Sequence, residues 1–441
     1  MKNNRLKMKF EMILCLCLLV LCVGLNYGQI PNEPQTLLPD QTIEREMTGA
    51  ETHRYKVSLK ADEFFQVHVE QKGLDVVLKL LDNKGNILTT MDTPTGKEGV
   101  ETLSFVIEKF GSFFLEVSGF DSKAEKGTYI IKREDSRPVT ISDKKRIEAE
   151  SIFMQRMNWR NKNSLGELEK FLPKLNTSLQ IWRELSDKYM TELVLQEISS
   201  IKKSYAGGLF YTGLDYEKGN TKEGLIKAIE FYQKAKVIYA EIGNFEDEAK
   251  CLVYVADNYY LLDQNQKALD YYLQSLHSLK RENPKGLTYW ELYTRAKSRT
   301  SILYSVLGEE QKALENYLDW LDFIESAKKA KYYYPHTIDD DKVSILSSIG
   351  VIYFDLGDKL KALEYFNQAV KGDYYYYGGG DKRKFAPIYE NMGFLYKDLG
   401  EIIKANEYFK KALDAYNTSK KYYEQRITSI KQTEYADTTS L

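Results

Sequence analysis

Residues 357–366 read GDKLKALEYF, and residues 400–409 return to the same pattern as GEIIKANEYF. Three more copies occur earlier in the chain, at residues 308–317 (GEEQKALENY), 263–272 (DQNQKALDYY) and 227–235 (KAIEFYQKA). Self-similarity at a spacing of a few tens of residues is typical of solenoids, in which pairs of helices stack side by side. We therefore predict that residues 206–418 form an all-α solenoid.

Two residue types recur at fixed places in these copies. Small residues stand where paired helices must approach closely, and aromatic residues stand where one helix wedges into the next. The small residues are Ala256, Gly350 and Gly393 on first helices and Ala268, Ala313, Ala362 and Ala405 on second helices. The aromatic residues on second helices are Tyr272, Tyr317, Phe366 and Phe409. A glycine at 308, 357 and 400 separates the helices of a pair, where a helix C-cap needs a positive φ.

These copies resemble tetratricopeptide repeats over at least residues 190–418. The alanines at 228, 268, 313, 362 and 405 are 40, 45, 49 and 43 residues apart, whereas the usual period is about 34 residues. The surplus is expected in longer second helices or in inter-repeat loops. The inter-repeat segments include the tyrosine clusters Tyr332–Tyr334 and Tyr374–Tyr377. These clusters are either sticky contacts for protein or glycan, or lengthened helix ends that pack on the next repeat.

The solenoid is expected to have irregular ends. Residues 143–205 are predicted to be a helical, divergent first repeat, and residues 419–441 a final helix and tail. Ser142 or Asp143 is expected to cap the helix that begins at Lys144.

Between residues 36 and 135, apolar and polar side chains alternate with the period of two that a β-strand imposes. The alternation is clearest at residues 55–59 (YKVSL) and 66–70 (QVHVE), and Gly85 and Gly111 lie in tight turns. Six or seven short strands at this spacing predict an antiparallel β-sandwich. The predicted fold class is therefore multidomain, with a β-sandwich at residues 36–135 followed by the solenoid.

The residue order in this stretch resembles the bacterial pre-peptidase C-terminal type of β-sandwich. The matching residues are His53-Arg54-Tyr55, Val67 to Gln71, Leu74 to Val77, Asp82 to Gly85, Glu101, Gly111 and Gly127-Thr128-Tyr129. More narrowly, the chain is similar to the non-catalytic front half of secreted proteins that often end in a caspase-like CHAT domain. The resemblance implies that the sandwich is an accessory module that helps binding or folding.

Residues 1–28 are predicted to be a signal peptide. Four basic residues precede an apolar run from Met12 to Leu25, which has the length of a secretory core and is short for a membrane span. We expect cleavage near Gly28, no integral membrane span afterwards, and a secreted location, periplasmic or extracellular in a bacterium. Lipid attachment at Cys22 is the weaker alternative, because Leu21 is bulky for that signal.

The charge and the cysteine content limit which partners, disulfides and metal sites the chain is expected to have. The net charge of −2 gives no basic footprint for nucleic acid. Only Cys251 follows the signal segment, so no internal disulfide is expected, and a packed thiol is the sensible interpretation of it. Asp75 and Asp82 are interpreted as turn residues and His53 and His68 as packed or surface residues; Glu101 has no visible partner. We therefore expect no metal and no cofactor.

First helices line the concave surface of tetratricopeptide proteins, so the resemblance implies that protein or extended peptide segments bind there. The residues predicted to face this groove are Lys250, Asp257, Tyr260, Arg295, Ser298, Phe354, Asp355, Glu390, Phe394 and Lys397. Co-chaperone repeats clamp a terminal carboxylate with a Lys-x-x-x-Asn pair, but Val253 and Asp257 occupy those positions here. A clamp for chaperone tails is therefore not expected.

The chain is not expected to be an enzyme. A CHAT peptidase needs a histidine and a cysteine beyond the repeats, but no cysteine follows Cys251 and no histidine follows His336. The leading hypothesis is a secreted, non-catalytic scaffold that mediates protein–protein interaction. One alternative is the regulatory front part of a CHAT-type cysteine protease whose catalytic domain is missing or separately encoded. Another is glycan binding by the β-sandwich.

Overall fold

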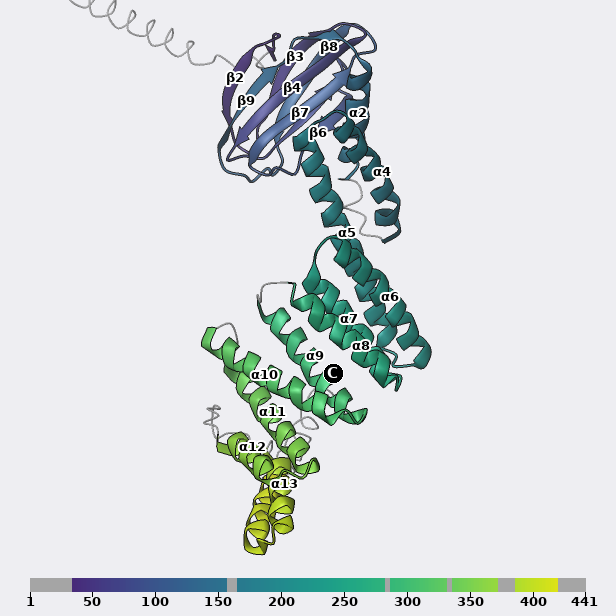
Figure 1. Cartoon of the computed structure of the whole chain (residues 1–441). Helices are drawn as coiled ribbons and strands as arrows, with labels where there is room; N and C mark the ends of the chain where they lie inside the picture. The colour runs from purple at the N-terminus through teal and green to yellow at the C-terminus, as the bar shows by residue number, and fades with distance from the viewer. Residues whose placement is uncertain (1–33, 157–164, 282–285, 331–334, 372–384, 419–441) are drawn as a thin grey trace, which may run out of the picture. The chain divides into compact units, whose positions relative to one another are not determined.

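The computed structural model describes residues 34–156, 165–281, 286–330, 335–371 and 385–418 (Figure 1). The predicted signal peptide, both tyrosine clusters and the predicted C-terminal segment 419–441 lie outside these residues. The chain divides into two compact units, Met1–Ile201 and Lys202–Leu441. Among the described helices, none is long and apolar enough to cross a membrane.

The first unit contains two five-stranded sheets. One has the order β1 (Gln35–Thr36), β3 (Thr52–Leu59), β8 (Gly111–Gly119), β5 (Val76–Leu81) and β6 (Ile87–Met91). The other has the order β10 (Arg137–Pro138), β4 (Glu63–Lys72), β9 (Gly127–Arg133) and β2 (Thr42–Met47), with β7 (Glu98–Val106) paired to β4. Adjacent strands are antiparallel except β1, which runs parallel to β3.

Alternating burial gives these sheets one core. Along β3, Tyr55, Val57 and Leu59 are buried while the residues between them are exposed, which confirms the predicted alternation there. Side chains from both sheets join a single hydrophobic cluster, with Leu115 from one sheet and Ile131 from the other both fully buried. Full burial of such a side chain contributes about 1.5–3 kcal/mol relative to exposure, so the shared core stabilises the unit.

A capped helix follows the last strand. α2 (Ile141–Met154) begins one turn earlier than predicted, because Thr140 is its N-cap and Asp143 completes the capping box at the third helical position. Arg137 donates two hydrogen bonds to the Asp143 carboxylate, of 2.6 and 2.8 Å. These bonds lower the pKa of Asp143 to about 2. α4 (Leu165–Glu184) packs against α2, and the N-terminal part of α5 (Lys188–Glu217) completes the unit.

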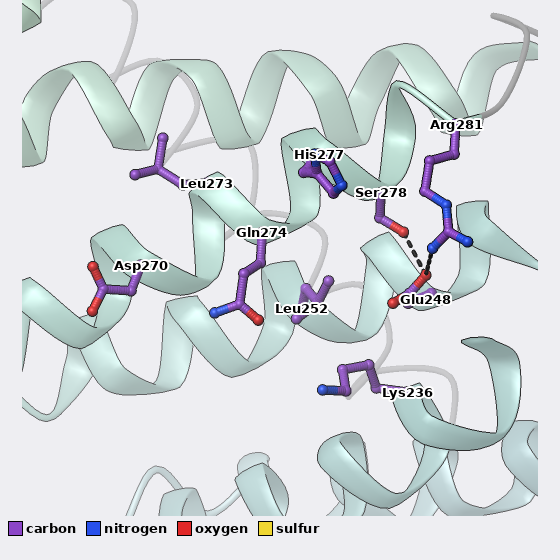
Figure 2. Close-up of a pocket in the computed structure, with 9 residues that line it drawn as sticks. All are labelled: Lys236, Glu248, Leu252, Asp270, Leu273, Gln274, His277, Ser278 and Arg281. Carbon is purple, nitrogen blue, oxygen red and sulfur yellow. Dashed lines mark hydrogen bonds and ion pairs between the residues drawn. The ribbon is translucent and has the colours of Figure 1, made fainter. Parts of the chain in front are cut away.

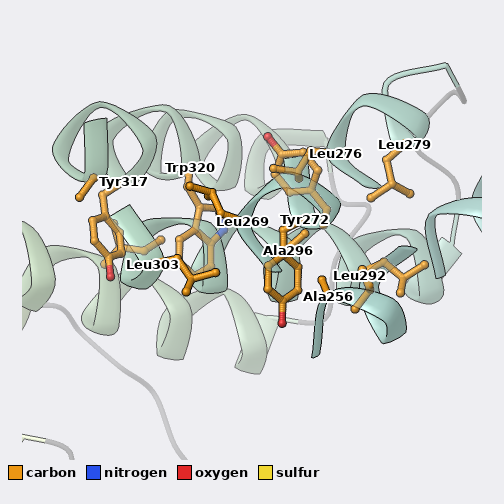
Figure 3. Packing of buried hydrophobic residues seen from close by; sticks show 14 of the residues in the cluster. Ala256, Leu269, Tyr272, Leu276, Leu279, Leu292, Ala296, Leu303, Tyr317 and Trp320 are labelled. Carbon is orange, nitrogen blue, oxygen red and sulfur yellow. The ribbon is translucent and has the colours of Figure 1, made fainter. Parts of the chain in front are cut away.

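The second unit is a succession of helices, each packed against the next. After the C-terminal part of α5 come α6 (Lys222–Glu241), α7 (Phe245–Leu261), α8 (Asn265–Leu279), α9 (Gly286–Val306), α10 (Glu310–Ala330), α11 (Pro335–Asp355), α12 (Lys359–Lys371) and α13 (Ala386–Asp398). A last helix covers residues 402–418. Leu269 and Tyr272 of α8 interleave with Ala256 of α7 and Ala296 of α9 (Figure 3). The core therefore runs from pair to pair, as a solenoid requires.

The turns within pairs have the predicted backbone. Gly308, Gly357 and Gly400 have φ of 76°, 81° and 79°, which confirms the expected left-handed C-caps. Asp263 takes the same conformation, with φ of 57°, at the corresponding place in the earlier pair. An aspartate tolerates this region better than most residues, so the repeat keeps its turn without glycine.

Candidate binding face on the first helices

α5, α7 and α9 are the first members of successive helix pairs, and α7 contacts α9 directly. Phe210 of α5 meets Tyr254 of α7 edge to face, with ring centroids 5.0 Å apart. Lys250 of α7 places its Nζ 4.6 Å from the centre of the Phe210 ring. Because the negative face of the ring attracts the ammonium group, the contact with Phe210 holds Lys250 at this junction.

Arg295 of α9 extends the same row. Its guanidinium carbon lies 5.2 Å from the centre of the Tyr254 ring, and it forms an ion pair with Asp257 of α7. The hydroxyl of Tyr272 donates a second interaction to the Asp257 carboxylate. Burial raises the pKa of Asp257, while Arg295 and Tyr272 oppose that rise. The carboxylate therefore anchors the exposed guanidinium through this ion pair, because opposite charges attract strongly where water is partly excluded.

Arg299 lies one turn after Arg295 on α9. Its guanidinium carbon is 5.1 Å from the centre of the Tyr260 ring of α7. Among the residues that the structure describes, no carboxylate forms an ion pair with Lys250 or Arg299. We call the set Phe210, Lys250, Tyr254, Tyr260, Arg295 and Arg299 the first-helix face.

A nearby acid serves the scaffold. Glu217 of α5 accepts a hydrogen bond of 2.5 Å from the Tyr232 hydroxyl and one of 3.2 Å from the Asn258 side chain. These bonds join α5, α6 and α7. Glu217 and Asp257 are therefore both engaged within the repeats, and the cations of the first-helix face carry the charge that a partner would meet.

The ten predicted groove residues fall into two groups. Lys250, Asp257, Tyr260 and Arg295 come together as described, and half-buried Ser298 lies on α9 between the two arginines. The second group comprises Phe354 and Asp355 at the end of α11 and Glu390, Phe394 and Lys397 on α13. In that group Glu390 accepts a hydrogen bond of 2.8 Å from the Tyr416 hydroxyl, and Phe394 is 47% exposed while packing edge to face on Phe409.

One predicted groove residue needs correction. Asp257 was expected to be exposed, but the residue is only 8% exposed and its carboxylate contacts Arg295 and Tyr272. It therefore positions an exposed arginine and does not itself face a partner. The tyrosine of the second helix turns the acid inward, which the first helix alone does not reveal.

Three members of the face were missed by sequence reasoning: Phe210, Tyr254 and Arg299. Tyr254 and Arg299 are each four residues after a predicted groove residue, Lys250 and Arg295 respectively. Phe210 contacts Lys250 through its ring. Lys250 and Tyr254 share one side of α7, as Arg295 and Arg299 share one side of α9, because residues four apart on a helix are neighbours. That spacing could have found Tyr254 and Arg299; Phe210 required the packing of α5 on α7.

A separate groove of about 420 Å³ lies among α6, α7 and α8 (Figure 2). Leu252 of α7 lines it together with Lys236 of α6 and Leu273, Gln274 and His277 of α8. His277, which sequence reasoning left without a role, is on the α8 wall. The groove is amphipathic, with an aliphatic floor and polar walls.

The polar residues of the first unit that a metal site could use form local hydrogen bonds instead. His53 Nδ1 lies 2.7 Å from the Tyr129 hydroxyl, and His68 Nδ1 lies 2.9 Å from Thr102 Oγ1. Asp82 accepts two backbone N–H bonds of 2.8 Å within its turn, as predicted. No group of three metal-binding side chains occurs within the described ranges.

Glu101 has no partner visible in the sequence, but the structure shows its partners. It is fully buried and accepts hydrogen bonds from the Thr93 backbone N–H at 2.7 Å and the Thr95 hydroxyl at 3.1 Å. Burial raises the pKa of Glu101 to about 7. The carboxyl group thus ties β7 to the chain after β6, and its role is structural.

A smaller pocket of about 200 Å³ in the first unit includes His68 and Glu150 in its lining. Glu150 of α2 accepts a hydrogen bond of 2.8 Å from the Ser104 hydroxyl of β7. Burial raises the pKa of Glu150 to about 8, although Arg146 and Ser104 act in the opposite direction.

Cys251 in the second unit is likewise buried, and burial raises the pKa of its thiol. The packed thiol is therefore confirmed.

Residues 343–372 and 386–419 match the family model described as tetratricopeptide repeat. The chain therefore carries tetratricopeptide repeats in its C-terminal part. No curated protein matches.

Solved structures match the chain at low sequence identity and with low TM-scores. BtubC from P. vanneervenii is 16% identical, with 57% of this chain and 92% of that chain covered and a TM-score of 0.39. MamA is 18% identical, with coverages of 47% and 97% and a TM-score of 0.33. The pre-peptidase C-terminal domain of a Bacillus anthracis collagenase is 19% identical, with coverages of 24% and 100% and a TM-score of 0.21.

Proposed function

We propose that this chain is a non-catalytic scaffold whose tetratricopeptide repeats bind segments of partner proteins on the first-helix face. The observation that carries the proposal is the row of three cations stacked on aromatic rings across α5, α7 and α9. Arginine and tyrosine are the residue types that dominate the energetics of protein interfaces. A stacked cation presents both a charge and a flat apolar surface, so the row suits an extended peptide.

The face is supported by its scaffold. Asp257 fixes Arg295, and Glu217 joins α5 to α6 and α7, so the face keeps its shape before a partner arrives. Side chains that are already ordered lose less conformational entropy on binding. This preorganisation favours recognition of a particular sequence over general stickiness.

The proposal includes a secreted location, because residues 1–28 have the pattern of a signal peptide. The two sheets of the first unit, with their shared core, support a β-sandwich of the pre-peptidase C-terminal type. The resemblance gives that unit an accessory role in binding or folding. We therefore place partner recognition in the repeats and assign the sandwich no site.

Crosslinking and capture from bacterial envelope extracts test the proposed function. Lys250→Glu and Arg299→Glu should each lower the recovery of a specific partner by about tenfold, because each reverses a charge on the face. Lys410→Glu is the matched control, since Lys410 is exposed on the last described helix. Equal recovery by all variants, or no partner with the unaltered chain, would refute the proposal.

A further inference from the structure

α7 contributes side chains to two different surfaces, which lie on opposite sides of the helix. Glu248 and Leu252 are one helical turn apart and line the groove among α6, α7 and α8, whereas Lys250 and Tyr254 belong to the first-helix face. Because successive residues of an α-helix are rotated by about 100°, positions two apart point in nearly opposite directions. The groove is therefore distinct from the first-helix face, although one helix serves both.

The groove follows one side of α8. Leu273 and Gln274 are four and three residues before His277, so their side chains lie on the same side of the helix as His277 (Figure 2). Leu252, which is 2% exposed, forms the floor, and Leu273, which is 38% exposed, forms an aliphatic rim. A volume of about 420 Å³ accommodates a few residues of an extended peptide.

One acid of the groove is paired with a cation, and the other, among the residues that the structure describes, is bonded only to a neutral amide. Glu248 accepts a hydrogen bond of 2.6 Å from the Ser278 hydroxyl and lies 3.8 Å from the Arg281 guanidinium. Arg281 also stacks 3.6 Å from the centre of the Phe245 ring. Asp270 accepts a bond of 3.1 Å from the Gln266 side chain.

Lys236 is the second cation of the groove, in addition to Arg281. It comes from α6 on the opposite wall, and no carboxylate pairs with it anywhere in the described part of the chain. Figure 2 shows its ammonium end directed along the groove, below Leu252 and Gln274. The groove thus offers, beside an aliphatic surface, one positive charge without an ion-pair partner among the described residues, while Asp270 is a carboxylate in the same lining without a cation partner.

We propose that this groove binds an extended peptide segment of a partner protein that carries an acidic side chain close to an aliphatic one. The carboxylate pairs with Lys236, and the aliphatic side chain covers Leu252 and Leu273. The Gln274 amide both donates and accepts hydrogen bonds, so it suits the peptide backbone between them. Because the first-helix face lies on the other side of α7, the repeats can hold two partners at once. This second site does not depend on the first.

Selection of random heptapeptides on the full chain, followed by fluorescence anisotropy with the selected peptides, tests the proposal. We expect one class of peptides with Asp or Glu within three residues of Leu or Ile. Lys236→Glu should weaken their binding by about tenfold or more, because it puts like charges together. Leu273→Asp should weaken it similarly. The control Lys250→Glu, on the other side of α7, should change it by less than about twofold.

The results separate this site from its alternatives. Acidic-aliphatic peptides that respond to Lys250→Glu and ignore Lys236→Glu would place binding on the first-helix face and overturn the proposal. Selection that yields no such peptides would also overturn it. A dimer of the full chain that dissociates on Lys236→Glu, seen by analytical ultracentrifugation, would show a second copy as the occupant and equally refute a foreign peptide. Circular dichroism melting of each variant confirms that the repeats remain folded.

Discussion

Gly350 of α11 lies directly against the ring of Phe366 on α12: a Cβ atom at position 350 would be 2.7 Å from two ring carbons. Gly393 and Phe409 repeat the relationship in the next pair, at 2.6 Å. Both helices are therefore at the closest separation that their aromatic wedge permits. The small residue and the aromatic residue form one packing unit.

Gly350→Ala should lower the free energy of unfolding by about 1–3 kcal/mol, because the added methyl group overpacks a filled core. Helix propensity alone predicts the opposite sign, since alanine in a helix interior is better than glycine by about 0.5–1 kcal/mol. Urea unfolding followed by circular dichroism measures the difference. Gly207→Ala on α5 is the control, because its nearest neighbour would be the Tyr239 hydroxyl at 3.6 Å. Stabilisation by both changes would contradict the packing argument.

This packing unit also shows why the repeats could be predicted. Close approach of two backbones demands a small residue, and the wedge opposite it demands a ring, so the geometry is recorded in residue types. The positive φ at positions 308 and 400 is likewise reflected in the residue type, which is glycine at both. The burial of Asp257 cannot be inferred from its residue type, because an acid on a first helix is equally compatible with solvent or with a tyrosine from the second helix.

The first unit shows the same limit. β2 was not predicted, since five of its six side chains are at least partly exposed and TIEREM has little apolar alternation. Glu101 lies eight residues after Thr93, and only the fold of the strands brings the two together. Strand alternation reports which face is buried, but a buried polar contact depends on neighbours that alternation does not specify.

Asp257→Ala should destabilise the repeats and release Arg295. The Tyr272 hydroxyl would lose its acceptor while buried, at a cost of about 1–3 kcal/mol. Asp257→Asn should cost less, because the amide oxygen still accepts from Tyr272. Urea unfolding measures both, and partner binding by Asp257→Ala should fall although Asp257 does not face the partner. Tyr272→Phe separates the two roles, since it removes the hydroxyl and leaves the ion pair between Asp257 and Arg295. Unchanged stability in Asp257→Ala would contradict this description.

The first unit should lose stability as the pH rises from 4.5 to about 8, between the ordinary pKa of Glu150 and its pKa in the fold. Burial raises the pKa of Glu150 to about 8 from the ordinary 4.5, with Asp187 adding to the rise and Arg146 opposing it. A carboxyl group with a raised pKa in the fold is neutral there, so its full stabilisation exists only below the unfolded value. That stabilisation is lost progressively up to the folded value. Glu101, with a pKa of about 7, adds to the same trend.

Urea unfolding of the first unit at pH 5.5, 7 and 9, followed by intrinsic fluorescence, measures this trend. Glu150→Gln should flatten the pH dependence, because glutamine resembles the protonated acid and cannot ionise. At pH 9 the variant should be the more stable chain, by an amount on the order of 1–3 kcal/mol. Glu44→Gln, on exposed β2, should leave the slope as it is. A slope that survives Glu150→Gln would assign it to other groups.

Cys251 should report opening of the second unit. Its side chain is fully buried on α7, and burial raises the pKa of the thiol, so both access and the thiolate fraction are low at pH 8. Alkylation by iodoacetamide, read from the Cys251 peptide by mass spectrometry, should be at least about a hundredfold slower than at Gln274→Cys in the groove. Urea should bring the two rates together at the unfolding transition. Rapid alkylation of Cys251 in the native chain would mean that α7 separates from its neighbours readily, and a helix that does so could not hold two binding faces in fixed geometry.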